Sequence, residues 1–319
     1  MSQSALAEHF DKARRGVGVG TGSGPKPKGR RRVNPTVMTL VLLAVPSLFL
    51  LLLINLYPLL YAAVQSVRSG TLISAGEFVG LQNYVDVLTD PAFWHSALFT
   101  LVFTISGVFG SWGIGLALAL LLRTRIPAGG LFKVLLLLPW VVPVVVSSTA
   151  WNWLVATPQS PLPVLLSSIG FDNVLFLADP TLAKITVCVF KVWISFPFMM
   201  MMMSSALASV DINVYEAAKV DGATGWQAFR SITMPLISRS TYISWILMTI
   251  FCVNDFPTIF LLTGGGPVNA TTSLVVLAYR TVFQNFQTGP GVAIAFLMTL
   301  VLVVVSVALY RQIRKVNIE

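Results

Sequence analysis

Six long apolar blocks set the limits on how this chain of 319 residues can fold. A helix needs about 20 apolar residues to cross the hydrocarbon layer of a membrane. Only 10% of the residues are charged, whereas a soluble domain has about 25%. We therefore expect an all-α, polytopic protein of the cell membrane with about six transmembrane helices. The blocks are Val37–Ala63, Ser96–Leu122, Val134–Ala156, Ile185–Leu207, Tyr242–Leu262 and Val292–Tyr310.

The basic residues are placed unevenly between these blocks. Of the 21 Lys and Arg residues, 17 fall in segments that alternation across the membrane would put on one side. Cytoplasmic segments of membrane proteins are enriched in Lys and Arg. This distribution therefore predicts that both termini are cytoplasmic, and it argues against reading the net charge of +9 as a sign of nucleic-acid binding. The 17 residues are Lys12, Arg14, Arg15, Lys26, Lys28, Arg30, Arg31, Arg32, Arg123, Arg125, Lys133, Lys219, Arg230, Arg239, Arg311, Arg314 and Lys315.

Residues 1–35 form a basic segment, rich in Gly and Pro, ahead of the first block. Its low apolar content predicts a disordered cytoplasmic tail, which leaves residues 36–319 as the transmembrane domain. The charge of the tail either sets the orientation of the first helix or binds anionic membrane lipid.

The sequence lacks the motifs of several enzyme classes. No Gly-Lys dipeptide occurs, so the chain has no phosphate-binding P-loop. Its two histidines, His9 and His95, cannot supply zinc chemistry of the His-Glu-x-x-His type. We therefore expect no catalytic residue, no metal site and no cofactor in this chain.

The most informative segment lies between the fourth and fifth blocks, at residues 208–235. Asn213 stands three residues before Glu216, which is capping-box spacing and predicts a helix start. Gly222 is placed to end that helix in a left-handed conformation. An ordinary connecting loop with surface helices is the alternative, because caps occur in any helical loop. A second capping-box pair and a proline suited to the first turn of the next membrane helix follow, at Thr224, Gln227 and Pro235.

Three stretches of the chain resemble a known family. Glu216-Ala217-Ala218, Asp221-Gly222-Ala223 and then Pro235 resemble the "EAA" loop of binding-protein-dependent ABC importers. That family often has Ile-Pro just ahead of the loop, where this chain has Val210-Asp211. The other two stretches resemble an external segment and the fifth-helix exit of sugar permeases, and they are Phe78-Val79-Gly80-Leu81-Gln82-Asn83-Tyr84 and Asp255-Phe256 with Leu262-Thr263-Gly264-Gly265-Gly266-Pro267.

The resemblance covers the chain from about Val37 to the C-terminus, and it is to the first permease subunit of maltose- and trehalose-type importers. It implies a type I ABC importer permease fold without catalytic activity, with ATP and Mg bound by two partner ATPase subunits. It also implies a second, homologous permease subunit, an extracytoplasmic sugar-binding protein, and a disaccharide substrate such as trehalose or maltose. The residues that it implies for coupling to the ATPase are Glu216, Ala217, Ala218, Asp221, Gly222, Ala223 and Pro235.

Five residues within or beside the apolar blocks are candidates for the substrate path. Ionisable residues in membrane helices are functional candidates, and sugars bind to carboxylates, amides and aromatic faces. Three candidates have a structural alternative: a hydrogen bond for Asp255, snorkelling to the surface for Lys191, and an interfacial aromatic belt for Trp153. The candidates are Asn152, Trp153, Lys191, Asn254 and Asp255.

The chief alternative function is an ion-coupled secondary transporter in which Asp255 and Lys191 carry the coupling ion. Such transporters are commonly built from inverted repeats. No internal repeat is visible in this sequence, so we favour the importer subunit.

Overall fold

A computed structural model describes residues 35–74, 76–123 and 127–316. Within these ranges the chain is helical, and β-pairing is limited to one isolated bridge between Arg68 and Phe78. The predicted all-α class is therefore confirmed. The chain divides into two units, Met1–Tyr57 and Pro58–Glu319, which we describe separately. The predicted tail, residues 1–35, lies outside the described residues except for Pro35.

Helix α2, Pro35–Ser66, contains the first apolar block. From Met38 onward its mean hydropathy is 2.5, and its length suffices to cross a membrane. The remaining helices belong to the second unit.

Three further continuous spans agree with blocks two, four and six. The first consists of α4, Pro91–Ile105, a π-helical turn at Ser106–Gly110 and α5, Ser111–Leu121. The others are α9, Pro180–Ala208, and α15, Thr288–Val316. As the sequence predicts, Pro91 begins α4, and the Asp90 carboxylate caps that helix at the Ala92 N–H.

The third apolar block is not one straight helix. It contains α6, Gly129–Val141, and α7, Val144–Val155, which meet at 92°. Pro143 lacks an N–H and forces the preceding residue out of helical geometry, and Val142 accordingly has ψ 131°. The described chain thus has five helices that could cross a membrane, or six if this bent pair forms one crossing.

The fifth apolar block is also interrupted. One continuous helix runs through α11, Gly225–Ala228, a π-helical turn at Phe229–Thr233 and α12, Met234–Val253. The chain breaks at Asn254 and Asp255 and resumes as α13. The remaining short helices are α13, Phe256–Thr263, α14, Leu274–Phe283, α3, Gln82–Thr89, α8, Pro161–Ser167, and α10, Ile212–Val220.

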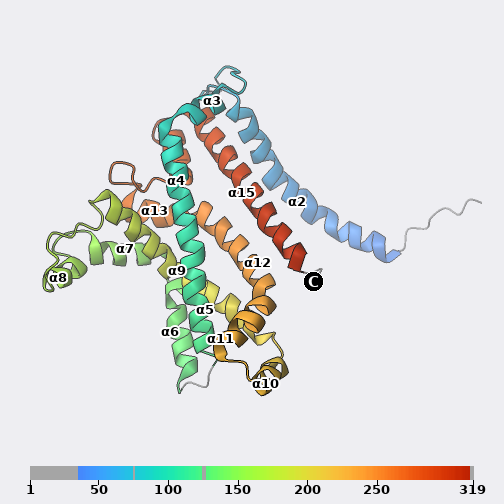
Figure 1. The fold of residues 1–319 in the computed structure, drawn as a ribbon. Helices are drawn as coiled ribbons and strands as arrows, with labels where there is room; N and C mark the ends of the chain where they lie inside the picture. The colour runs from blue at the N-terminus through green and yellow to red at the C-terminus, as the bar shows by residue number, and fades with distance from the viewer. Residues whose placement is uncertain (1–34, 75, 124–126, 317–319) are drawn as a thin grey trace, which may run out of the picture. The chain divides into compact units, whose positions relative to one another are not determined.

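Close packing of α5 on α9 fixes the centre of the second unit. A Cβ atom added at Gly115 would lie 2.7 Å from the backbone nitrogen of Met200, so a larger residue would push the two helices apart. Fully buried side chains of five helices, among them Phe103, Phe190 and Met248, fill the adjacent core. Figure 1 shows α3 at one end of this unit and α10 at the other.

Candidate functional site

The N-cap of helix α10 lies two residues earlier than the sequence predicts. Its N-cap is Asp211, whose carboxylate accepts a hydrogen bond of 2.9 Å from the Asn213 N–H. The predicted capping role of Asn213 is therefore wrong, because Asp211 already satisfies the first free N–H groups and Asn213 lies inside the first turn. Asp211 occupies the position where the EAA-loop family often has proline.

The end of α10 confirms the prediction for Gly222, which has φ +79°. The Gly222 N–H donates to the Lys219 carbonyl at 3.2 Å, and the Ala223 N–H donates to the Ala218 carbonyl at 2.9 Å. This pair of bonds is the Schellman motif, which satisfies the last free carbonyls of a helix. Asp221 is the C-cap between them.

The next helix start also follows the predicted spacing. Thr224 and Gln227 form a capping box at the N-terminus of α11. Pro235 lies in the first turn of α12, as the sequence predicts, and α11 runs on through the π-helical turn into α12 as one continuous span. The wider turn ahead of Pro235 accommodates its missing N–H without a break.

Two contacts attach α10 to neighbouring membrane helices. The Tyr215 hydroxyl and the Thr233 hydroxyl, just before α12, are joined by a hydrogen bond of 3.1 Å. The guanidinium of Arg123, just after α5, lies 4.4 Å from the centre of the Tyr215 ring, which is cation–π geometry. A displacement of α10 would therefore pull directly on both helices.

The outer surface of α10 and α11 combines small, acidic and apolar side chains. Glu216 and Ala217 are exposed, and Ala218 is half-buried. Val220 is 87% exposed and Trp226 is 68% exposed. Large exposed apolar side chains on an otherwise polar surface are typical of a protein-binding site.

A buried ion pair joins α9 to the break that follows α12. The Lys191 Nζ atom lies 2.6 Å from Asp255 Oδ2, and each side chain is 7% exposed. The other oxygen, Oδ1, accepts a hydrogen bond of 3.0 Å from the Thr258 N–H and caps α13. Snorkelling of Lys191 to the surface is therefore wrong, because a buried carboxylate lies within its reach near the middle of α9.

The ion pair borders a cavity of about 340 Å³ beside the bend between α6 and α7. Ser195, one helical turn after Lys191, also lines it, and in the described chain the Ser195 hydroxyl has no hydrogen-bond partner. Trp140 and Phe251, each about two-fifths exposed, contribute aromatic surface. The cavity thus combines charged, hydroxyl and aromatic groups, which suits a polar organic ligand.

The other three substrate-path candidates do not line the cavity beside the ion pair. The Asn152 amide donates to the Leu262 carbonyl at 3.4 Å, and Asn152 and Trp153 line a separate cavity of about 390 Å³. The exposed Asn254 donates to the Ile250 carbonyl of its own helix. The structure therefore brings together Lys191 and Asp255 of the five candidates.

Sequence reasoning did not find Ser195, Trp140 or the role of Tyr215. Ser195 follows Lys191 by four residues, a spacing that places both on one helix face and could have indicated it. The contacts of Trp140 depend on the bend at Pro143, and those of Tyr215 depend on helix packing.

Comparison with known proteins identifies the family. A family model described as "Binding-protein-dependent transport system inner membrane component" matches residues 16–317. The chain belongs to this family. It is therefore a permease subunit, the non-catalytic, multi-pass inner-membrane component of a binding-protein-dependent transport system. The alternative of an ion-coupled secondary transporter is wrong on this finding.

Several curated relatives match most of the chain. The trehalose/maltose transport system permease protein MalF of Thermococcus litoralis is 35% identical over 247 residues, which cover 77% of this chain and 83% of that protein. The sulfoquinovosyl glycerol transport system permease protein SmoG of Agrobacterium fabrum is 31% identical over 276 residues, which cover 86% of this chain and 90% of that protein. The trehalose transport system permease protein SugA of Mycobacterium tuberculosis is 30% identical over 260 residues, which cover 81% of this chain and 82% of that protein.

The fold agrees with a solved permease. A bacterial ABC transporter involved in the import of the acidic polysaccharide alginate matches with a TM-score of 0.77 at 20% identity, covering 88% of this chain and 96% of that chain. At this identity the likeness shows the ABC importer permease fold alone.

Proposed function

We propose that this chain is one of two different permease subunits in an ATP-driven importer of a neutral saccharide. Its partners are a second, homologous permease, two ATPase subunits that bind ATP and Mg, and an extracytoplasmic sugar-binding protein. The names of two relatives support the substrate class, because trehalose and maltose are uncharged disaccharides. Trehalose and maltose are the first candidates.

The observation that carries the proposal is the placement of α10 between the two helices that hold the ion pair. Going back from α10, α9 leads to Lys191, and going forward, α11 and α12 lead to Asp255. Lys191 lies 17 residues before the end of α9, or about 25 Å along the helix. A shift of α10 by the ATPase is thus transmitted to both sides of the 340 Å³ cavity.

The exposed surface of α10 and the turn that follows it suit the helix for that role. Glu216 and Ala217 present a small, acidic surface to a groove on the ATPase, and Asp221, Gly222 and Ala223 fix the turn that follows. In this proposal α10 lies on the cytoplasmic side, where the excess of basic residues also places both termini.

The cavity is suited to an uncharged substrate. Lys191 and Asp255 neutralise each other, so a ligand with a net charge would have no counter-charge there. The free Ser195 hydroxyl can form a hydrogen bond with a sugar hydroxyl. The rings of Trp140 and Phe251 offer faces on which a sugar ring can stack.

Uptake by proteoliposomes that contain the complete transporter tests this function. With the binding protein outside and ATP inside, we expect accumulation of labelled trehalose or maltose and exclusion of their carboxylated analogues. Vesicles with this chain alone are the control, and they should neither accumulate sugar nor hydrolyse ATP. Sugar flux through the chain alone, driven by an ion gradient, would contradict the proposal.

A further inference from the structure

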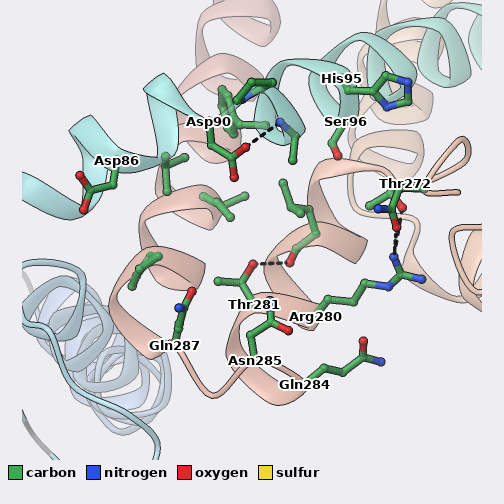
Figure 2. Close-up of a pocket in the computed structure, with 18 of the residues that line it drawn as sticks. Asp86, Asp90, His95, Ser96, Thr272, Arg280, Thr281, Gln284, Asn285 and Gln287 are labelled. Carbon is green, nitrogen blue, oxygen red and sulfur yellow. Dashed lines mark hydrogen bonds between the residues drawn. The ribbon is translucent and has the colours of Figure 1, made fainter.

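The cavity of about 390 Å³ that contains Asn152 and Trp153, here called the outer cavity, is separate from the cavity beside the ion pair. None of the residues that line the outer cavity is ionisable. A larger cavity of about 830 Å³, with α3 and α4 on one side and α14 and α15 on the other, instead includes Asp86, Asp90 and Arg280, as Figure 2 shows. The outer cavity therefore suits an uncharged ligand, because a charged ligand would find no counter-charge there.

Two amide side chains in the outer cavity have free hydrogen-bonding capacity. The amide nitrogen of Asn152 donates to the Leu262 carbonyl, and within the described chain the amide oxygen accepts no hydrogen bond. Gln159 is exposed, and its side chain makes no hydrogen bond with any described residue. An amide offers both donors and an acceptor, so Asn152 and Gln159 can each pair with hydroxyl groups of a sugar.

The indole ring of Trp153 lies beside these amides and is 70% exposed. A ring of this size gains free energy when a ligand covers it. A tryptophan can also be exposed because it belongs to the aromatic belt at the membrane interface. Trp94 is such a comparison, since it is exposed, its Nε1 atom donates to the Leu88 carbonyl at 2.8 Å, and it does not line the outer cavity.

A tight turn after α7 gives the outer cavity a fixed rim. The Thr157 N–H donates to Ser160 Oγ at 3.1 Å, and the Ser160 N–H donates to the Thr157 carbonyl at 2.9 Å. Pro161 then begins α8. The rim is thus ordered before a ligand arrives, which lowers the entropy cost of binding.

The helices α7 and α13 connect the outer cavity with the cavity beside the ion pair. Val144, at the start of α7, lines the cavity beside the ion pair, and Asn152 lies about 12 Å further along the same helix. Asp255 caps the start of α13, and Leu262, near the end of α13, accepts the bond from Asn152. The segment that follows α7 is predicted to be external, so the outer cavity lies on the outward side of the ion pair.

We propose that the outer cavity is a second saccharide subsite, in which a sugar ring stacks on Trp153 and bonds to Asn152 and Gln159 before it moves along α7 to the ion pair. The substrate class in this proposal rests on the function proposed above. A sugar fits better than a lipid acyl chain, because an acyl chain would cover the free amides without bonding to them.

Protection of a cysteine from alkylation tests this subsite in the complete transporter without the binding protein. Val164 is exposed and lines the outer cavity, so Val164→Cys reports on it and leaves both amides in place. Trehalose or maltose should slow alkylation at residue 164, measured by mass spectrometry of that peptide. Adding Trp153→Ala should raise the sugar concentration for half-maximal protection by about tenfold, because the stacking face is lost. The matched control is Trp94→Ala, which should leave this concentration unchanged.

The outcomes separate the subsite from the importer function, which uptake by proteoliposomes measures independently. Equal half-maximal concentrations for Trp153→Ala and Trp94→Ala would overturn the subsite and assign Trp153 to the interfacial belt. A Val164→Cys transporter that imports sugar but shows no protection would overturn the subsite while the importer stands. Protection without any uptake would overturn the importer and leave the outer cavity as a sugar site. Equal protection by glucuronate would contradict a site for uncharged sugars.

Discussion

At the scale of single residues, the ion pair between Lys191 and Asp255 is the most consequential contact. A buried pair adds little to stability compared with apolar residues, but removal of one partner leaves an uncompensated buried charge. That loss costs about 3–5 kcal/mol. The pair also holds α9 against the break before α13, so it has both a structural and a proposed substrate-path role.

A double-mutant experiment separates these two roles. Lys191→Met and Asp255→Leu alone should each lower the yield and thermal stability of the assembled transporter, because each leaves the other residue's charge buried without a partner. The combined variant should recover stability, since no charge remains buried, yet it should take up sugar poorly. Stability is measured by thermal aggregation in detergent, and uptake is measured in proteoliposomes. Normal uptake by the stable double variant would show that the pair is structural only.

Local sequence patterns correctly predicted the backbone conformation and capping of some residues. The left-handed Gly222 and the Thr224–Gln227 capping box depend on residues within one or two turns, so their spacing is sufficient. The partner of Lys191 lies 64 residues away, and no local pattern could have paired the two residues. The prediction that Asn213 caps α10 failed because Asp211, two residues earlier, competes for the same free N–H groups.

At the scale of elements, hydropathy located the apolar blocks but not their breaks. A window average treats residues on both sides of Pro143 as one block, although the helices there meet at 92°. Membrane helices tolerate proline where neighbouring groups satisfy the backbone, as α9 does at Pro197. Sequence alone therefore could not indicate which proline breaks a helix, and the 340 Å³ cavity depends on that break.

The turn after α10 gives an element-scale prediction. A Cβ atom at Gly222 would meet no atom within 4 Å, so Gly222→Val acts only through the positive φ. Left-handed geometry costs a residue with a side chain about 1–2 kcal/mol. That cost should misplace α10 and lower co-purification of the ATPase subunits, while the membrane domain stays folded. Gly225→Ala, also in open space but without a positive φ, should bind them normally.

At the scale of the whole molecule, the predicted alternation of segments across the membrane stays a prediction, and one contact is consistent with it. Arg123 and Tyr215, from two segments predicted to be cytoplasmic, are in contact. The length and composition of the helices were sufficient to predict the all-α membrane fold. The cavity of about 830 Å³ was not predictable, because α3 and α4 form one wall and α14 and α15 form the other, and these two pairs lie far apart in the sequence.

Orientation across the membrane is tested by labelling. Cysteines at Ser74 and Ser167, which are both exposed and both in segments predicted to be external, should react with an impermeant maleimide added to intact cells. A cysteine at the exposed Lys219 of α10 should react only after permeabilisation. The reverse pattern would place α10 outside and exclude its contact with a cytoplasmic ATPase.

The transmission of ATP-driven motion through α10 is tested most directly by the ratio of sugar imported to ATP hydrolysed. Proteoliposomes with wild-type, Gly222→Val or Gly225→Ala transporter should be compared at equal amounts of assembled complex. We predict that Gly222→Val lowers the ratio several-fold, whereas Gly225→Ala matches the wild type. A Gly222→Val transporter that assembles fully and keeps the wild-type ratio would show that α10 is only a connector.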